Sequence, residues 1–251
     1  MKVFFFPFLL ISLFAHTAFS QVPDSLREAL GQTTSPSEWT SKALQLSYEN
    51  ASRYPFFSLK LARQAYDTAE VLQNNALRAR ALSRVGVVHF YLANYEAAID
   101  FHYKAYILQD SLGLIDEMAV SLNNLALAFQ QNEDYSRAID YYKDAAEGFD
   151  ETGKYLKRAT VYNNLGIVFR NTGDLDSAMY YYKKSLEISR IRKNKQLLMY
   201  NYNNLGNLYL DLGRYANAYQ AFSQALEMAY QLVNNYEKAN RDYRSNAGYW
   251  R

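Results

Sequence analysis

Apolar and small side chains recur along most of this chain with a period of about 40 residues. The triplet Asn-Asn-Leu stands at 123–125, at 163–165 and again at 203–205. When its Leu is numbered position 7 of each unit, the apolar and small residues fall at positions 4, 7, 8 and 11 and again at 20, 24 and 27. Steps of three and four place each group on one face of a helix. Each unit is therefore predicted to form two helices, and the fixed period predicts a stack of such units.

The smallest residues stand where two helices of one unit would meet. Position 8 is Gly86, Ala126, Gly166 and Gly206, and position 20 is Ala98, Ala138, Ala178 and Ala218. Small residues let two backbones approach, and larger ones at positions 7, 11 and 24 fill the space beside them. At position 15, Gly173 and Gly213 are suited to end the first helix in a left-handed conformation. At position 16, Asn94, Asp134 and Asp174 are predicted to cap the second helix.

These residues resemble the signature of the tetratricopeptide repeat family, with Leu, Gly and an aromatic residue in the first helix and Ala, an aromatic residue and Ala in the second. The resemblance covers about residues 79–232 and is strongest in the units that hold Leu125, Leu165 and Leu205. The family norm is shorter, at about 34 residues. The longer unit with Asn-Asn-Leu is similar to the variant in kinesin light chains and in exported segments of bacterial sensor kinases. The resemblance implies an all-α, right-handed solenoid of about five helix-turn-helix repeats.

The repeat phase also predicts the boundaries along the chain. Four repeats occupy 76–236, at about 79–118, 119–158, 159–198 and 199–236. A degenerate repeat is expected at 38–75, where Pro55 suits a first helical turn and Ser58, Ala62 and Ala65 fall at positions 20, 24 and 27. Residues 21–37 are expected to be a polar linker, and 237–251 either a capping helix or a repeat that is cut off.

Residues 1–20 are typical of a signal peptide. Lys2 precedes an apolar run from Val3 to Ala15, and Ala18 and Ser20 place small residues at −3 and −1 of a cleavage before Gln21. The run is shorter than the roughly 20 residues that span a bilayer. The chain is therefore predicted to be exported, periplasmic or secreted, without a membrane partner after cleavage unless it belongs to a longer protein.

Charge and composition exclude several classes of function. The formal net charge of +2 gives no strong field for nucleic acid, and the 0 Cys residues exclude disulfides, Cys-based metal sites and thiol nucleophiles. The run Arg190 to Lys195 is expected to be a solvated turn. The 24 Tyr residues suit half-exposed walls of a binding surface.

No residue pattern supports catalysis. His89 and His102 fall at positions 11 and 24 of one unit, where the resembled family has core aromatics, and no third metal ligand is evident. Asp174 and Asp176 lack the glycine and distal Glu of a calcium loop. Phosphate-binding loops, HExxH, GxSxG and the dinucleotide fingerprint are absent from the sequence. We therefore expect a protein that is not an enzyme and has no metal and no cofactor.

The paired asparagines are the strongest candidates for binding. The resemblance implies that positions 2, 5, 6, 9, 12 and 13 of the first helices line a concave groove. An Asn amide offers a donor and an acceptor and can bind the backbone of an extended peptide. The predicted peptide-binding residues are Asn123, Asn124, Asn163, Asn164, Asn203, Asn204, Arg84, Gln130, Arg170 and Asn207. The alternative is structural: the Asn side chains bond one another or a neighbouring helix and fix the stacking angle.

Two functions are consistent with the sequence. The first is an exported scaffold that binds a peptide or partner helix in its groove. The second is the extracytoplasmic sensor segment of a signalling protein, a histidine kinase or transcriptional regulator, whose membrane and output parts lie outside this sequence. The lining residues do not reproduce the Lys/Arg/Asn clamp for a C-terminal carboxylate. The identity of the ligand and the oligomeric state are not determined by the sequence.

Overall fold

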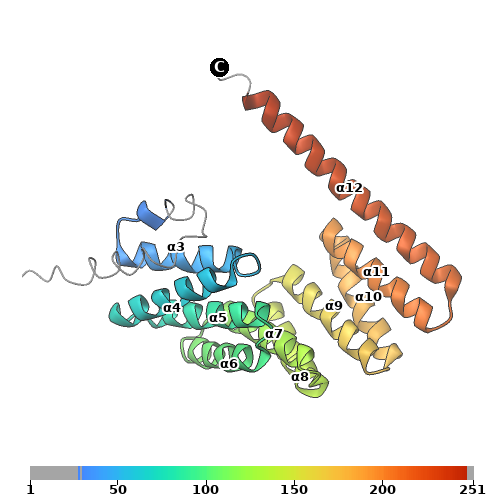
Figure 1. Ribbon diagram of the computed structural model, residues 1–251. Coiled ribbons are helices and arrows are strands. Elements are labelled where there is room, and N and C mark those ends of the chain that lie inside the picture. The colour runs from blue at the N-terminus through green and yellow to red at the C-terminus, as the bar shows by residue number, and fades with distance from the viewer. Residues whose placement is uncertain (1–27, 29, 248–251) are drawn as a thin grey trace, which may run out of the picture. The chain divides into compact units, whose positions relative to one another are not determined.

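The computed structural model describes residue 28 and residues 30–247, with side chains through Asn235. Between residues 36 and 247 it consists of ten helices joined by short turns, without a strand, so the all-α prediction is confirmed (Figure 1). The predicted signal peptide lies outside the described residues. The helices are α3 Pro36–Glu49, α4 Pro55–Val71, α5 Asn75–Tyr91, α6 Tyr95–Ser111, α7 Ile115–Gln131, α8 Tyr135–Glu151, α9 Tyr155–Asn171, α10 Leu175–Ile191, α11 Lys195–Asp211 and α12 Tyr215–Ala247.

A left-handed residue follows each helix from α4 to α11. Gly113, Gly153, Gly173 and Gly213 have φ between 65° and 83°, and they include the two glycines predicted at position 15. The remaining turns use residues with a side chain at φ of 52° to 60°: Gln73, Ala93, Glu133 and Lys193. These positions recur at a constant interval along the chain. A helix of 17 residues and the short turn after it therefore form the structural half-repeat.

The N-caps predicted from the sequence are confirmed. The side-chain oxygens of Asn94, Asp134 and Asp174 each accept a hydrogen bond from the backbone N–H three residues later. The hydrogen bonds from Ser177 to Asp174 lower the pKa of that carboxyl. Asp174 is therefore a helix cap, and its charge lies at the N-terminus of α10, where the helix dipole favours an anion.

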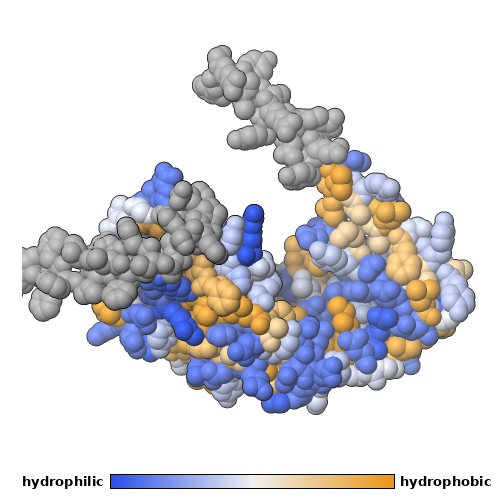
Figure 2. Space-filling view, in the orientation of Figure 1, coloured by the Kyte–Doolittle hydropathy of each residue, from blue (hydrophilic) through white to orange (hydrophobic). Residues whose placement is uncertain are grey.

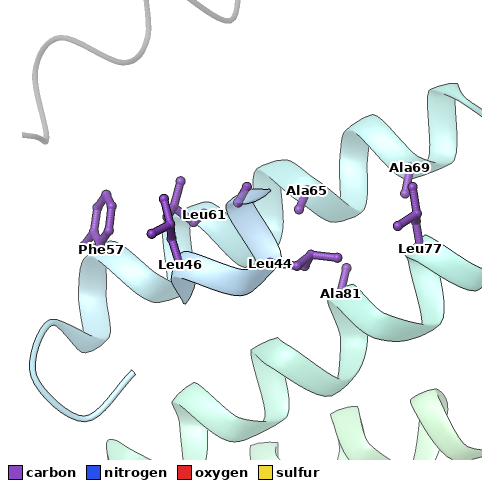
Figure 3. Packing of buried hydrophobic residues seen from close by; sticks show 9 residues of the cluster. Leu44, Leu46, Phe57, Leu61, Ala65, Ala69, Leu77 and Ala81 are labelled. Carbon is purple, nitrogen blue, oxygen red and sulfur yellow. The ribbon is translucent and has the colours of Figure 1, made fainter. Parts of the chain in front are cut away.

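The chain divides into two compact units, residues 1–132 and 133–251, each of which is described by itself. In unit 1, α3, α4 and α5 enclose an apolar cluster, and Figure 3 shows its side chains directed into the space between these helices. Leu61, Ala65, Ala69 and Ala81 have no exposed surface, so α4 lies close to both neighbours. The segment 38–75 thus packs as a helix pair onto α5, with α4 beginning at Pro55.

In unit 2 the core contains aromatic side chains that lie against glycine. Tyr182 of α10 is buried beside Gly166 of α9, where an added Cβ would come within 2.4 Å of the ring. Phe222 of α12 lies in the same way beside Gly206 of α11. The glycines at position 8 are therefore needed for the close packing of the two helices within a repeat, as the spacing predicted.

Two element boundaries differ from the sequence prediction. α3 begins at Pro36, because Ser35 accepts a hydrogen bond from the Glu38 N–H and Pro36 fits the first turn. At the other end, α12 continues through residue 233, where the regular interval would place another turn. The sequence predicts a separate capping helix or a cut-off repeat at 237–251. The residues of this segment up to Ala247 instead continue α12.

In the part of the chain that the structure describes, none of the helices combines the length and the apolar character needed to cross a bilayer.

Candidate functional site

The candidate site lies on the first helices of the repeats. In unit 1, α3 contacts α5 and α5 contacts α7, in addition to the contacts between helices that follow one another in the chain. In unit 2, α9 contacts α11 in the same way. The first helices of each unit therefore form a continuous layer. We call the surface made by positions 2, 5, 6, 9, 12 and 13 of these helices the first-helix face.

In unit 2 the asparagines of the first-helix face bond one another. Asn204 Nδ2 donates to Asn163 Oδ1 over 2.9 Å and so joins α11 to α9. Asn163 is buried and Asn204 half-buried. Asn164 hydrogen-bonds the hydroxyl of Tyr142, a residue of α8 whose pKa is raised by its burial. We call the paired asparagines at positions 5 and 6 of the first helices the Asn ladder. The contacts in unit 2 agree with the structural alternative, in which these side chains bond one another or a neighbouring helix.

A second pair joins the same two helices. The guanidinium of Arg170 donates to both carboxylate oxygens of Asp211, with Nη2 3.2 Å from Oδ1 and Nε bonded to Oδ2. This hydrogen bonding raises the pKa of Arg170. The sequence predicts Arg170 as a peptide-binding residue, but in the structure its charge is already neutralised by a partner in the next repeat.

In unit 1 the corresponding face carries a cation without such a partner. Arg84 occupies position 6 of α5, where the later repeats have Asn, and its guanidinium stacks on the ring of Tyr48 at 4.3 Å. Burial lowers the pKa of Arg84, and Arg80 lowers it further. The Arg84 Nε is buried without a hydrogen-bond partner, and among the described residues Arg84 forms no ion pair. Buried charges are otherwise almost always paired.

The asparagines of α7 are also less satisfied than those of unit 2. Asn123 Nδ2 donates to Asn124 Oδ1 over a long 3.4 Å. The Asn123 Oδ1 is buried and accepts no hydrogen bond from a residue of unit 1. Unit 1 thus combines an unpaired donor on α5 with an unpaired acceptor on α7.

The other predicted residues are placed as follows. Asn203 is exposed, whereas Gln130 and Asn207 are half-buried on the same face. Arg80, next to Arg84 on α5, bonds Glu117 of α7 at 3.0 Å. Phe90 and Tyr91 at the end of α5 form an edge-to-face pair, and Tyr91 is exposed. The first-helix face of unit 1 therefore has an aromatic border.

The two histidines do not form a metal site in the described residues, where no group of three His, Cys, Asp or Glu side chains could hold an ion. His102 is buried against Gly86, and burial lowers its pKa to about 3, with Arg84 adding to the shift. His89 stacks on Phe101 at 5.4 Å, and burial lowers its pKa as well. The two histidines therefore occupy positions that hold aromatic residues in the other repeats.

Two buried polar pairs were not predicted from the sequence. Ser189 of α10 accepts from Asn201 of α11 at 3.3 Å. In the orientation that satisfies its amide, Gln109 of α6 donates to Ser121 of α7 at 2.8 Å. Both pairs join one repeat to the next, and at the equivalent place between α8 and α9 the residues are the apolar Phe149 and Val161. Each pair consists of two polar residues at positions where Phe149 and Val161 are both apolar. This pattern could have indicated the two hydrogen-bonded pairs from the sequence.

Comparison with known proteins identifies the repeats. A tetratricopeptide repeat model matches residues 117–191, and a second model of the same description matches residues 201–229. Both matches fall on helix pairs with the turns and glycines described above. The chain contains tetratricopeptide repeats. A comparison with curated protein sequences gave no match.

Solved structures show the same TPR fold. BtubC from P. vanneervenii superimposes with a TM-score of 0.64 at 22% identity, over 83% of this chain and 92% of that one. The kinesin light chain repeats of Podosopora anserina give 0.64 at 13% identity, over 80% and 99%. The Rap conjugation gene regulator of plasmid pLS20, solved in complex with the Phr* peptide, gives 0.63 at 17% identity, over 82% and 56%. The predicted similarity to kinesin light chain repeats is thus confirmed at the level of the fold.

Proposed function

We propose that this TPR chain is a non-enzymatic scaffold that binds a peptide or partner segment on its first-helix face, and that the binding site lies in unit 1. The observation that carries the proposal is the contrast between the two units. In unit 2 the predicted binding residues satisfy one another, through Asn204 with Asn163 and Arg170 with Asp211. In unit 1, Arg84 and Asn123 keep buried polar atoms without partners.

The chemistry of these two groups defines the ligand. A guanidinium fixed against an aromatic ring presents its donors in a planar fork that suits a carboxylate. An amide oxygen accepts from a backbone N–H of any residue. An extended peptide with an Asp or Glu side chain would supply both partners. The gain is larger than for an exposed pair, because an unpaired buried polar group costs about 1–3 kcal/mol.

The structural neighbours support this proposal by analogy. The Rap regulator was solved with a peptide, and this chain has the same fold. The first-helix face of unit 1 also has the exposed Tyr91 beside it, and tyrosine contributes contact area at a small entropic cost. The unit 2 asparagines are assigned to repeat stacking, so the two interpretations of the Asn ladder apply to different parts of the chain.

Selection of peptides on the purified protein tests the proposal. Random peptides displayed on phage are enriched on the immobilised chain, and the enriched peptides are synthesised for affinity measurement by calorimetry. We expect peptides that contain Asp or Glu. Arg84→Gln should weaken their binding by at least about tenfold, which corresponds to about 1.4 kcal/mol, and Asn123→Ala should weaken it by severalfold.

Matched variants in unit 2 provide the controls. Asn203→Ala replaces an exposed member of the same ladder and should leave both the affinity and the melting temperature unchanged. Asn204→Ala should lower the melting temperature of the protein without lowering its affinity for the peptide. Enriched peptides that bind Arg84→Gln as tightly as the unmodified chain would rule out the site in unit 1.

Export and a sensor role are separate proposals that rest on the sequence. The apolar segment before Gln21 supports export, and mass spectrometry of protein recovered outside the cytoplasm should find Gln21 as the first residue. The sensor hypothesis is favoured by the same segment in combination with the long repeats. Recovery of the full-length chain from the cytoplasm alone would remove the support for both.

A further inference from the structure

Helix α12 exposes a continuous apolar stripe. Five large side chains are each 54–78% exposed and follow steps of 4, 7, 4 and 3 along the helix: Tyr215, Tyr219, Leu226, Tyr230 and Val233. At about 100° per residue, all of them lie within about 60° of one another around the helix. Figure 2 shows apolar side chains along the visible side of α12 below the grey segment. Scattered apolar residues are common on a surface, but an ordered stripe marks an interaction site.

Three of the five equivalent residues of the preceding repeat are covered, whereas the other two are the exposed Arg190 and Lys193. One repeat earlier, α10 carries Leu175, Met179 and Leu186, which pack in the core cluster that α10 shares with α11. In α12 a different side of the helix faces α11, and it holds Ala218, Ala221 and Ala225. The stripe on α12 is therefore the surface that a following helix would occupy, and no described residue occupies it.

The length of α12 gives a second observation. It has 33 residues, whereas α11, the helix it packs on, has 17. At about 1.5 Å per residue, α12 is about 50 Å long and α11 about 25 Å. Figure 1 shows α12 continuing past the end of α11. A single helix without a neighbour is marginal in water at a length of about 15 residues, so the extension needs a packing partner.

We propose that this partner is a second copy of the same chain, paired through α12 as a two-stranded coiled coil. Tyr219, Leu226 and Val233 are spaced by one heptad, which is the spacing that keeps a seam facing an identical helix. The helix is also almost uncharged between residues 215 and 235, where Glu227 is the one ionisable acid or base other than tyrosine. Two copies of this face can therefore approach without charge repulsion, and no field on it selects an oppositely charged partner.

The first test is the mass of the purified chain by sedimentation equilibrium. We expect twice the chain mass of 29.1 kDa at micromolar concentrations. Leu226→Glu places a charge in the centre of the seam and should raise the dissociation constant at least a hundredfold. Val71→Glu changes an exposed apolar residue in unit 1 and should leave the dimer unaffected. Circular dichroism verifies that each variant remains helical.

The second test uses the absence of Cys from the sequence. A single Leu226→Cys variant should form a disulfide-linked dimer under mild oxidation. Gln220→Cys is exposed on another side of α12 and should cross-link far more slowly. Three outcomes would each overturn the proposal: a chain that stays monomeric at about 100 μM, a dimer that survives Leu226→Glu, or equal cross-linking of the two Cys variants. Peptide binding at Arg84 is independent of these outcomes.

Discussion

At the scale of single residues, some turns hold a residue that is less stable in the left-handed conformation than glycine would be. Lys193 adopts φ of 52° at a position where other turns have glycine. The left-handed conformation costs a residue with a Cβ about 1–2 kcal/mol, and glycine avoids this cost while losing some entropy. The two turns marked by Gly173 and Gly213 could be recognised from the sequence. The run Arg190 to Lys195 was predicted to be a turn, but its left-handed residue could not be identified, because nothing in the Lys193 side chain favours positive φ.

The first prediction concerns this turn. Lys193→Gly should raise the free energy of unfolding by about 0.5–1 kcal/mol, because it removes the left-handed strain. The reverse change, Gly213→Ala, should lower it by about 1 kcal/mol or more, since it introduces the same strain. Urea titration of the two variants measures both effects. A destabilised Lys193→Gly protein would show that the lysine side chain makes a contribution larger than the strain.

The buried His102 predicts a pH dependence. Its pKa is about 3 in the folded chain and 6.5 in the unfolded reference, so below pH 6.5 the unfolded state binds a proton that the folded state does not. Stability should therefore decrease as the pH is lowered from 6.5 towards 3, by up to about 1.4 kcal/mol per pH unit from this group. His102→Phe should reduce that slope, because Phe222 occupies the same position in the last repeat. Unfolding free energies at pH 7 and pH 5 measure the difference, and equal slopes for both proteins would contradict it.

At the scale of elements, polar pairs determine how one repeat packs on the next. The bond from Asn204 to Asn163 and the ion pair of Arg170 with Asp211 both join α9 to α11. The repeat pattern predicted that these positions share one face. For the asparagines it left open whether they bond each other or a ligand, and it did not predict the pairing of Arg170 with Asp211. Such contacts depend on the separation of two helices, which the spacing within one helix does not define.

The variant pair Asn204→Ala and Asn203→Ala tests this role. Asn204→Ala leaves the buried Asn163 Oδ1 without a donor and should lower the free energy of unfolding by about 1–3 kcal/mol. Asn203 is its exposed neighbour in the same helix, and its replacement by Ala should change stability by no more than about 0.5 kcal/mol. Thermal and urea unfolding of both variants gives the comparison. A similar effect of the two changes would mean that the hydrogen bond between Asn204 and Asn163 adds nothing to stability beyond the difference in helix propensity between Asn and Ala.

At the scale of the whole molecule, the contacts are local. Within each unit, each helix packs on the helices next to it in the chain or on the next first helix. In such an array stability is close to a sum of repeat and neighbour terms. A change in one repeat should therefore loosen that repeat and its neighbours without loosening distant ones.

Hydrogen exchange of a core variant tests this locality. Leu205→Ala removes a buried side chain from the cluster of α10, α11 and α12 and should cost about 2–5 kcal/mol. We expect faster amide exchange in α10 to α12 and unchanged exchange in α3 to α5, as measured by mass spectrometry. Equal acceleration in α3 to α5 would show that the chain unfolds as one cooperative body.

The sequence alone determined the helix pairs, their regular period and the close contacts at Gly166 and Gly206. These features follow from local rules, since side-chain size and helical spacing act within one repeat. Tertiary structure decided which polar groups remain unpaired and which face of α12 stays uncovered. Pairing depends on distances between residues in different repeats, as with Tyr48 and Arg84 or Asn163 and Asn204. The same residue type can thus join repeats in unit 2 and keep a buried, unpaired oxygen in unit 1.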